Sequence, residues 1–419
     1  MSDTNKQSLE MSCASLELSS GKLKSAIKSK FATILSGIED GQLVILWPNG
    51  AETRHGTVSS QVAHNVTIEF HSYRPVQRLI FGGAVGFAES YLRAEWSCNN
   101  LTNFFSLVMR NENRLFSPTR GKQVSRLART IRHLLNRNSK RGSQKNISYH
   151  YDLGNSFYRL WLDRSMSYSA GVFHDESMTL EQAQLGKMEK IAQMLNASAG
   201  ERVLEIGCGW GSLAQFLAVK NGCSVDAISL SHQQLDYANA ALESNTDISD
   251  SSASVEFRHQ DYRAVERTYD HIVSVEMFEA VGEEYWKAYF SKVAQLLESG
   301  GNVVLQVITI LEERFDHYKK NPDFIQRYIF PGGMLPTKTR LLDLIEEAGL
   351  QLVDSFWFGE GYAETLRHWS DRFEESSNEI FAQGYDERFV RMWRYYLNYC
   401  EVGFRFGSTD VGLLACKKV

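Results

Sequence analysis

The chain has 419 residues, a length that predicts two or three domains. Hydrophobic residues make up 43% and charged residues 23%, so the chain is neither disordered nor fibrous. No segment approaches eighteen consecutive apolar residues and the first twenty residues are polar, so we expect neither a transmembrane helix nor a secretory signal. The six cysteines lie far apart without a CxxC pair, which argues against a disulfide framework or a metal site and favours a reducing cytosol.

The net charge of −5 conceals a strongly basic segment. Between Arg114 and Lys145 the sequence has seven Arg, three Lys and no acidic residue. A cationic segment in an otherwise acidic chain indicates an anionic partner, either nucleic acid or an anionic lipid surface.

Residues 1–22 are polar and are predicted to be a disordered tail. Residues 23–112 are expected to form a small α+β domain, with strands over Leu43–Pro48 and Asn65–Phe70 and a helix over Val76–Trp96. Because the segment contains no catalytic constellation, we interpret it as a packed accessory domain.

Residues 113–147 are predicted to be a basic amphipathic linker. Apolar residues between Val124 and Leu135 fall on one helical face, and the basic residues fall largely on the other. This pattern favours a helix that lies on an anionic membrane surface, with a solvated linker helix packed on a domain as the alternative. We expect no nucleic acid partner, because the segment lacks aromatic residues for stacking.

Residues 148–419 alternate apolar strand patterns with helical patterns, which is typical of a mostly parallel sheet. The predicted strands are Arg202–Ile206, Ser224–Leu230, Val255–His259, Asp270–Val275 and Asn302–Ile308. Residues 245–254 are predicted to be a polar loop.

The clearest functional motif begins at Val203, where an apolar strand runs through Glu205 into Gly207, Gly209 and Gly211. Glycines let a backbone approach a ligand where a Cβ would clash, and doubly wound sheets bind ligands at the carboxyl ends of their strands. This tight glycine pattern suits the amino-acid end of S-adenosylmethionine better than a dinucleotide pyrophosphate. We expect Glu205 to hold the positive amino group of that cofactor.

Polar residues after the next two strands predict the rest of the cofactor site. Ser229 and Gln234 follow the second strand, and hydrogen bonds from such residues can serve the ribose hydroxyls. Gln260 and Asp261 follow the third strand, where Asp261 can accept a hydrogen bond from the adenine amino group.

With these residues in place, the sequence resembles the cyclopropane-fatty-acyl-phospholipid synthases and the related mycolic acid methyltransferases. The matching motifs follow the family's order and are Tyr149–Asn155, Met166–Ser169, Leu204–Ser212, Met277–Gly282, Tyr328–Gly333, Tyr362–Trp369 and Tyr395–Cys400. The resemblance implies a Rossmann-like class I α/β methyltransferase domain over residues 148–419, with a mostly parallel seven-stranded sheet and an inserted lid region. It also implies that the preceding α+β domain is lipid-carrier-like.

The resemblance implies methyl transfer from S-adenosylmethionine to a cis double bond of an unsaturated phospholipid acyl chain. A carbocation then forms, and a bound bicarbonate ion removes a proton so that a cyclopropane ring closes. The positions that match the family's bicarbonate site are Ala170, Glu279, Gln306, Ile308 and Tyr362. The resemblance assigns catalytic roles to Glu279, Tyr362, Gln306 and Cys400, and cofactor contacts to Tyr168 and Ser169.

The residue chemistry leaves two of these roles open. Glu279 is repulsive toward bicarbonate unless it orients a donor or holds a proton, so a structural capping role is the alternative. Cys400 lies in an apolar, aromatic helical segment, where a cysteine is commonly an inert small hydrophobe.

Two positions depart from the family pattern. Ala170 replaces a cysteine, which a contact through the backbone N–H would tolerate. Gln306 replaces a histidine of the bicarbonate site, and an amide donates a hydrogen bond but carries no charge near neutral pH. Non-cyclising methylation of unsaturated acyl chains is therefore one alternative, and a lipid-binding protein with a degenerate methyltransferase domain is another.

The predicted partners are an anionic phospholipid membrane surface and unsaturated phospholipid acyl chains. The expected location is the cytoplasm, on the inner face of the membrane, and a homodimer is left open. A small-molecule methyltransferase of the same fold would lack the accessory domain and the basic segment.

Overall fold

The computed structural model describes residues 21–57, 65–115, 153–249 and 253–418. The chain divides into two compact units, Met1–Val124 and Ser125–Val419, each of which is described by itself. The predicted disordered tail and the predicted basic linker lie almost wholly outside the described residues. Helix α2 begins at Gly21, within the range predicted as a tail. Arg114 belongs to the predicted linker, and its guanidinium lies 2.9 Å from the Glu39 carboxylate.

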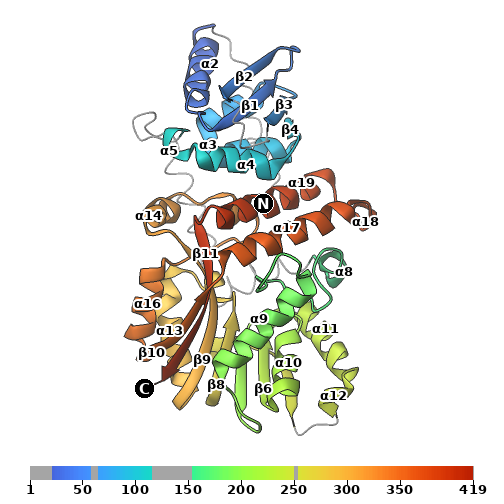
Figure 1. Cartoon of the computed structure of the whole chain (residues 1–419), viewed down its shortest axis with the longest axis vertical. Helices are drawn as coiled ribbons and strands as arrows, with labels where there is room; N and C mark the ends of the chain where they lie inside the picture. Colours follow the sequence, from blue (N-terminus) through green and yellow to red (C-terminus); the bar gives the residue numbers. More distant parts are fainter. Residues whose placement is uncertain (1–20, 58–64, 116–152, 250–252, 419) are drawn as a thin grey trace, which may run out of the picture. The chain divides into compact units, whose positions relative to one another are not determined.

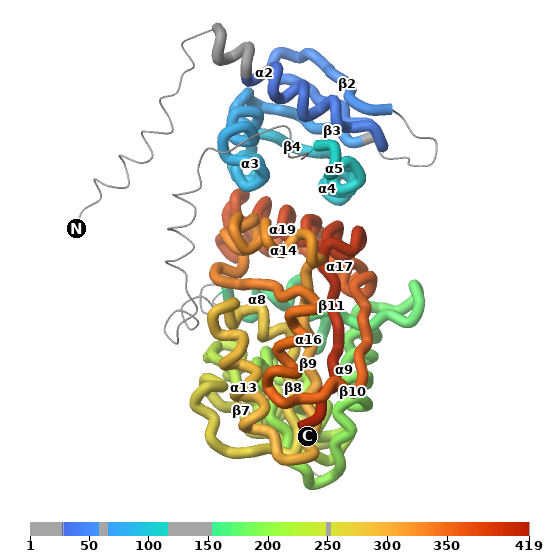
Figure 2. Tube along the Cα trace, turned by 90° about the vertical axis from the view of Figure 1, so that its left-hand side faces the viewer, coloured from blue at the N-terminus to red at the C-terminus, as the bar shows by residue number. Residues whose placement is uncertain are grey.

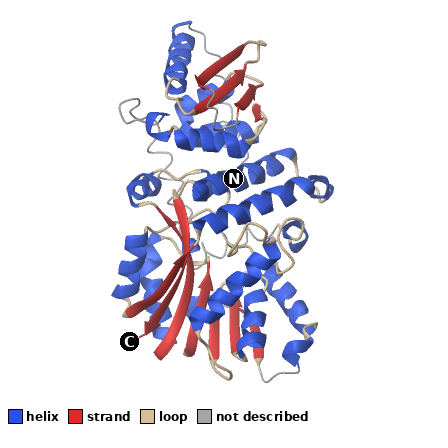
Figure 3. Ribbon diagram, in the orientation of Figure 1, coloured by secondary structure: helices blue, strands red, loops and turns tan. Residues whose placement is uncertain are grey.

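The first unit combines helices with a small sheet (Figure 3). Its described elements are α2 (Gly21–Leu35), β1 (Gly41–Leu46), β2 (Glu52–Thr57), β3 (Asn65–Phe70), α3 (Arg74–Leu92), β4 (Trp96–Cys98), α4 (Leu101–Arg110) and α5 (Glu112–Leu115). The strand order is β2-β1-β3-β4, in which β1 runs parallel to β3 and the other neighbours are antiparallel.

The strands predicted in this unit correspond to β1 and β3, in which every second side chain is buried in the core. Strand β2 was not predicted, because its sequence is polar and largely exposed. The predicted helix Val76–Trp96 differs from α3, which is interrupted at Gly83 (φ 62°) and ends at Leu92. Trp96 instead begins β4, where its indole N–H donates to the Ser90 hydroxyl at 2.9 Å.

The second unit is built on a seven-stranded sheet with helices on both faces (Figure 1). Its strands are β5 (Arg202–Ile206), β6 (Ser224–Ser229), β7 (Ser254–His259), β8 (Tyr269–Val275), β9 (Leu297–Ile310), β10 (Leu350–Trp357) and β11 (Thr409–Lys418). The order is β10-β11-β9-β8-β5-β6-β7, and only β11 runs antiparallel to its neighbours. The predicted mostly parallel seven-stranded sheet is confirmed.

The helices of this unit lie between and beyond the strands. They are α8 (Asn155–Tyr158), α9 (Leu180–Leu195), α10 (Ser212–Asn221), α11 (His232–Glu243), α12 (Thr246–Ser249), α13 (Trp286–Leu296), α14 (Glu312–Lys320), α15 (Phe324–Tyr328), α16 (Lys338–Glu347), α17 (Gly359–Glu375), α18 (Ser377–Ala382) and α19 (Glu387–Arg405). The predicted polar loop at 245–254 therefore includes a short helix, α12.

The five strands predicted from the sequence correspond to β5 through β9, and β5 has the predicted bounds. Strand β9 is longer than predicted at both ends. Strands β10 and β11 were not located from the sequence. In β10 this follows from its exposed, mixed composition, which does not give the apolar run of a buried strand.

The strand order reverses at β5, since β6 and β7 lie on one side of it and β8 and β9 on the other. Open α/β sheets bind ligands outside the carboxyl ends of the strands at such a point. The predicted glycine loop follows β5, so the topology places it at this position.

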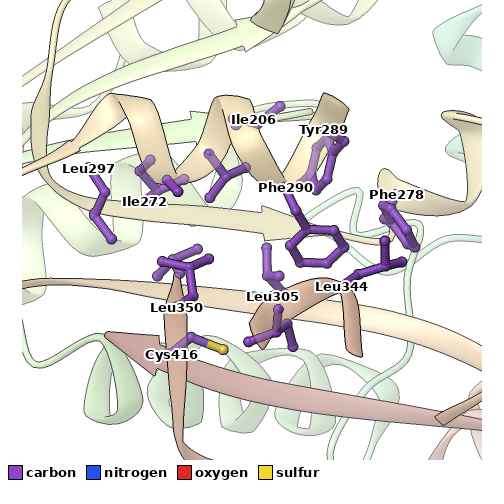
Figure 4. Close-up of a cluster of buried hydrophobic side chains, with 14 of the residues drawn as sticks. Ile206, Ile272, Phe278, Tyr289, Phe290, Leu297, Leu305, Leu344, Leu350 and Cys416 are labelled. Carbon is purple, nitrogen blue, oxygen red and sulfur yellow. The ribbon is translucent and has the colours of Figure 1, made fainter. Parts of the chain in front are cut away.

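One face of the sheet is covered by α13 and α16 (Figure 4). Tyr289 and Phe290 of α13 and Leu344 of α16 pack against Ile272 and Leu305 of the sheet, and all five side chains are nearly inaccessible to solvent. This core fixes the carboxyl ends of β8 and β9, from which site residues project.

Helices α17, α18 and α19 are inserted between β10 and β11, and α17 and α19 lie side by side (Figure 2). Aromatic contacts join this insertion to the segment after α8. The Trp161 ring lies 5.6 Å from Trp369 of α17 and 5.3 Å from Trp393 of α19, measured between centroids. The second unit therefore contains an inserted helical region, as predicted.

None of the described helices has both the length and the apolar character needed to cross a membrane. Within the described ranges, no group of His, Cys, Asp and Glu side chains is arranged to hold a metal ion.

Candidate cofactor and catalytic site

A cavity of about 180 Å³ lies at the carboxyl ends of β5, β6 and β8. Nine of the ten residues predicted to bind the cofactor line it, and Gly211 is the exception. These nine are Tyr168, Ser169, Glu205, Gly207, Gly209, Ser229, Gln234, Gln260 and Asp261. The fold thus brings together side chains from four separate loops.

The three glycines after β5 all have positive φ angles but differ in their surroundings. A Cβ added to Gly209 (φ 52°) would meet no protein atom within 4 Å, so this position opens on the cavity. A Cβ added to Gly211 (φ 85°) would lie 2.5 Å from the Phe257 ring and 2.8 Å from the Ala238 methyl group. Gly211 therefore serves the packing of α10, α11 and β7, and Gly209 serves the approach of a ligand.

Glu205 is buried at the end of β5, with 3% of its surface exposed. Its Oε2 atom has no hydrogen-bond partner among the described residues. Burial raises the pKa of this carboxyl to about 8, although the nearby Lys187 ammonium opposes the shift. An orphaned, buried carboxyl oxygen beside a glycine loop fits the ammonium group of S-adenosylmethionine.

Lys187 of α9 is a site residue that was not predicted. It is 3% exposed, lines the cavity, and its Nζ donates to the Ser169 hydroxyl. Burial lowers the pKa of Lys187 to about 8, and the charges of Glu276, Asp163 and Glu205 oppose this shift. Lys187 falls on the apolar face of α9. Because buried lysines are rare unless paired, a lysine at such a position could have indicated a site residue from the sequence alone.

The polar residues after β6 and β7 are held by local hydrogen bonds. The Ser229 hydroxyl donates to the Gln234 side-chain oxygen at 3.1 Å, and the Gln260 amide donates to the Ala264 carbonyl at 3.1 Å. Arg263 donates to both oxygens of Asp261, at 2.8 and 2.6 Å. The Arg263 backbone N–H also donates to Asp261, at 2.9 Å, so these hydrogen bonds fix the carboxylate at the cavity wall.

Tyr168 forms an aromatic wall of the cavity. Its ring centroid lies 5.3 Å from Trp369 and 5.5 Å from Trp161, and its hydroxyl lies 2.9 Å from the hydroxyl of Tyr396. The inserted helices therefore fix the orientation of a ring that comes from the segment before α9.

Glu276, which follows β8, is a second residue that was not predicted. It lines the cavity and is partly buried. Its Oε1 accepts hydrogen bonds from the Ala170 backbone N–H at 2.9 Å and from the Gln306 amide at 2.7 Å. Its Oε2 accepts from the Tyr362 hydroxyl at 2.6 Å. Burial raises the pKa of Glu276, and these three donors and Lys187 oppose that effect.

Glu279 lies one turn further along and points to a different donor. Its Oε1 accepts from the Ile308 backbone N–H at 2.6 Å, and its Oε2 has no hydrogen-bond partner among the described residues. Burial and the charge of Glu276 raise the pKa of Glu279 to about 8. Both effects favour the protonated form of this carboxyl group.

The residues predicted to bind bicarbonate do come together, but they do not fit a bound bicarbonate ion. Ala170, Gln306 and Tyr362 donate to Glu276, and Ile308 donates to Glu279. Every predicted donor is thus engaged by a carboxyl group of the protein. A further anion would lack donors and would be repelled by Glu276.

Cys400 of α19 lies close enough to Tyr362 and Tyr396 to affect the pKa of both hydroxyl groups electrostatically. Burial raises the pKa of its thiol, and Asp323 raises it further. The thiolate that a nucleophilic role would need is therefore strongly disfavoured.

The strand order, the glycine loop after β5 and the buried acid beside it define a class I S-adenosylmethionine-dependent methyltransferase. The family profile described as mycolic acid cyclopropane synthetase matches residues 138–414, and the chain belongs to this family. The protein is therefore an enzyme that uses S-adenosylmethionine for methyl transfer or cyclopropanation on lipids, and the alternative of a degenerate domain is set aside.

Curated relatives and solved structures agree with this assignment. The chain is 36% identical to a tuberculostearic acid methyltransferase of Mycobacterium tuberculosis over 343 residues, covering 78% of both proteins. It is 37% identical to the cyclopropane-fatty-acyl-phospholipid synthase of Escherichia coli over 332 residues, covering 78% of this chain and 82% of the relative. A mycolic acid cyclopropane synthase solved in complex with SAH and CTAB matches with a TM-score of 0.61 and 28% identity, over 66% of this chain and 98% of that one.

Two glycine variants should separate ligand approach from packing. Gly209→Ala should weaken binding of S-adenosylhomocysteine by about tenfold or more, a loss of at least about 1.4 kcal/mol. It should lower the free energy of unfolding by only about 1–2 kcal/mol, the cost of a left-handed conformation. Gly211→Ala adds a clash and should cost about 3 kcal/mol of stability. Calorimetry and denaturant unfolding measure the two effects, and normal affinity in Gly209→Ala would refute the assignment of Gly209 to the ligand.

Binding of S-adenosylhomocysteine at pH 7 should release a proton. Glu205 is mostly protonated in the free protein because its pKa is raised to about 8, and an adjacent ammonium group favours the ionised form. The release should approach one proton at pH 7, fall to about half a proton near pH 8, and vanish only about two pH units above the pKa, where Glu205 is already ionised. Calorimetry in buffers of different ionisation enthalpy measures it. Equal release by the parent and by Glu205→Gln would contradict this role.

Proposed function

We propose that the enzyme transfers a methyl group to a cis double bond of an unsaturated phospholipid acyl chain and closes a cyclopropane ring. The observation that carries the proposal is the composition of one cavity wall, which contains both the aromatic ring of Tyr168 and the carboxylate of Glu276. An alkene that captures a methyl cation becomes a carbocation, and a carbocation needs an aromatic face and a base. The name of the Escherichia coli relative supports a phospholipid substrate.

S-adenosylmethionine supplies a methyl group on a positively charged sulfur. Glu205 and the glycine loop hold the amino-acid end of the cofactor, and Ser229, Gln234, Gln260 and Asp261 serve its nucleoside end. Tyr168 and Ser169 contribute from the segment before α9. These residues fix the position of the methyl group, so that the substrate double bond alone has to be brought to it.

Tyr168 stabilises the developing carbocation through its ring face, an interaction of about 0.5–2 kcal/mol when water is excluded. Trp161 and Trp369, which are fully buried behind it, keep the ring in place. A closed aromatic wall also keeps water from capturing the cation. Tyr362 and Gln306 act by positioning the carboxylate of Glu276, and Cys400, whose thiolate is disfavoured by burial, has no chemical role.

Non-cyclising methylation is the second candidate. It is favoured by the relative named as a tuberculostearic acid methyltransferase, and by Gln306 and Ala170, which depart from the family pattern. The two reactions share every step until the proton leaves, so the same site supports both.

Expression of the chain in a bacterial host that lacks such an enzyme should distinguish these outcomes. Fatty acids analysed by mass spectrometry should gain one CH₂ relative to the host's unsaturated species. Mild hydrogenation then distinguishes the products. A cyclopropane product is left unchanged, whereas an open-chain product with a remaining double bond is reduced to a methyl-branched chain. A Glu205→Gln strain provides the control for cofactor dependence. Unchanged fatty acids in the parent strain, despite soluble protein that binds cofactor, would contradict a phospholipid acyl substrate.

We also propose that the enzyme meets its substrate at the cytoplasmic surface of an anionic membrane, through the basic residues between Arg114 and Lys145. Each basic residue near such a surface contributes about 1 kcal/mol, and salt screens this attraction. The proposal rests on the charge of this sequence segment.

Vesicle co-sedimentation tests the membrane proposal. Replacement of Arg126, Arg129, Arg132 and Arg137 by Gln should weaken binding to anionic vesicles by at least about tenfold, since each charge is worth about 1 kcal/mol. The matched control replaces the same number of exposed basic residues outside the segment, namely Lys30, Arg54, Arg93 and Lys287. Equal binding to neutral and anionic vesicles, or equal loss in both variants, would refute an electrostatic role for this segment.

A further inference from the structure

Three donors that the family resemblance assigns to a bicarbonate ion converge on a side chain of the protein itself. They are the Ala170 backbone N–H, the Gln306 amide and the Tyr362 hydroxyl, at 2.6 to 2.9 Å from the oxygens of Glu276. We propose that the Glu276 carboxylate is the catalytic base and takes the place of bicarbonate in this enzyme. This inference rests on the proposed function, in which an acyl carbocation must lose a proton.

The hydrogen bonds leave the carboxylate oriented and able to react. A carboxylate has about four acceptor sites, and the two donors on Oε1 and the one on Oε2 fill three of them. The remaining site is on Oε2, beside the Tyr362 hydroxyl. Because Glu276 lines the cavity that also contains Tyr168 and Ser169, that site is available to a ligand in the cavity.

The backbone of Glu276 supports the same interpretation independently. Its φ of 47° places a non-glycine residue in the left-handed region, which costs energy and is uncommon. Its N–H donates to the Gln306 carbonyl at 2.9 Å, so the strained conformation is held by the same residue that orients the carboxylate. Strain of this kind persists where the surrounding structure enforces it, and such positions cluster at functional sites.

The neighbouring charges assign different roles to the two carboxyl groups. Glu276 interacts with the Lys187 ammonium, which favours its ionised form, and its charge also acts on Glu279. Burial raises the pKa of both carboxyl groups. The Lys187 ammonium and the three donors oppose this effect at Glu276, whereas the charge of Glu276 adds to it at Glu279, so a proton on the pair is favoured at Glu279. When the environments of two neighbouring carboxyl groups push their pKa values apart, the group that ionises more easily commonly serves as the base and the other stays neutral.

The proposed step balances in atoms and electrons. The alkene electron pair forms a bond to the methyl carbon, and the carbon–sulfur bond breaks with its electrons returning to sulfur, giving S-adenosylhomocysteine and a carbocation. A C–H bond of the transferred methyl group then breaks for ring closure, or a C–H bond next to the cationic carbon breaks for a non-cyclising product, and the proton forms an O–H bond with Glu276. The released electron pair closes the cyclopropane ring, or forms a new double bond in a non-cyclising reaction. No further reactant is needed, so the enzyme should not depend on bicarbonate.

Two substitutions of Glu276 make opposite predictions about bicarbonate. The space between the three donors is called the anion position. Glu276→Gln keeps this position filled, because the amide oxygen accepts from Ala170 and Gln306 while the amide N–H donates to the Tyr362 hydroxyl. Glu276→Gly empties the position, and glycine suits the positive φ. Glu256→Gln, at an exposed carboxylate on β7, is the matched control. The measurement is the rate of S-adenosylhomocysteine formation with vesicles of dioleoyl phosphatidylglycerol, in buffer freed of carbon dioxide and with added bicarbonate.

The parent enzyme and Glu256→Gln should show the same rate with and without bicarbonate. Glu276→Gln should lose about 100-fold or more in rate, as expected for a general base, and bicarbonate should not restore it. Glu276→Gly should be equally slow without bicarbonate and should recover by about tenfold or more when it is added. Bicarbonate dependence of the parent, near-normal rates in Glu276→Gln, or no recovery in Glu276→Gly would each overturn the inference. Unchanged affinity for S-adenosylhomocysteine shows that the variants are folded.

A binding measurement separates this inference from the proposed function. If the parent enzyme forms no methylated phospholipid, the proposed substrate is wrong, but the assignment of the anion position can still be tested. Binding of ¹³C-bicarbonate, followed by NMR, should occur in Glu276→Gly and not in the parent or Glu276→Gln. Bicarbonate binding by the parent would overturn the inference whatever the substrate.

Discussion

The hydrogen-bonded carboxylate of Glu276 is the interaction on which the rest of the site depends. Its donors come from the segment before α9, from β9 and from the inserted helix α17. A charged group removed from water is tolerated only when it is paired and hydrogen-bonded. The requirement to satisfy this one carboxylate therefore ties the inserted helices to the carboxyl edge of the sheet, next to the cofactor cavity.

The electrostatic balance of the cavity also points to its cofactor. Glu205 and Glu276 line the wall with Lys187, and Glu279 lies beside them. The carboxyl groups outnumber the one lysine in this set, and burial raises the pKa of each of them. A ligand that brings a sulfonium and an ammonium charge favours the ionised forms of these carboxyl groups, above all of Glu205. The same cavity therefore favours S-adenosylmethionine over its neutral-sulfur product, which supports turnover.

Local sequence patterns predicted the central strands and the cofactor loop, because apolar runs and glycines act within a few residues. They did not locate β10, whose exposed composition hides its pairing with β11. Glu276 escaped prediction for a different reason. Its donors lie 106, 30 and 86 residues away in the sequence, and its φ angle is a tertiary property. The resemblance named the three donors, which the structure brings together, but it did not name Glu276 as their acceptor, because the family's pattern has a bound anion at this place.

The most direct measurement is a crystal structure of the enzyme with S-adenosylhomocysteine, grown with bicarbonate in the solution. The account predicts that density for the Glu276 carboxylate fills the space between the Ala170 N–H, the Gln306 amide and the Tyr362 hydroxyl, with no separate anion. It also predicts the ligand's amino group beside Glu205. A planar ion bound to those three donors, with the Glu276 side chain turned away, would contradict the account.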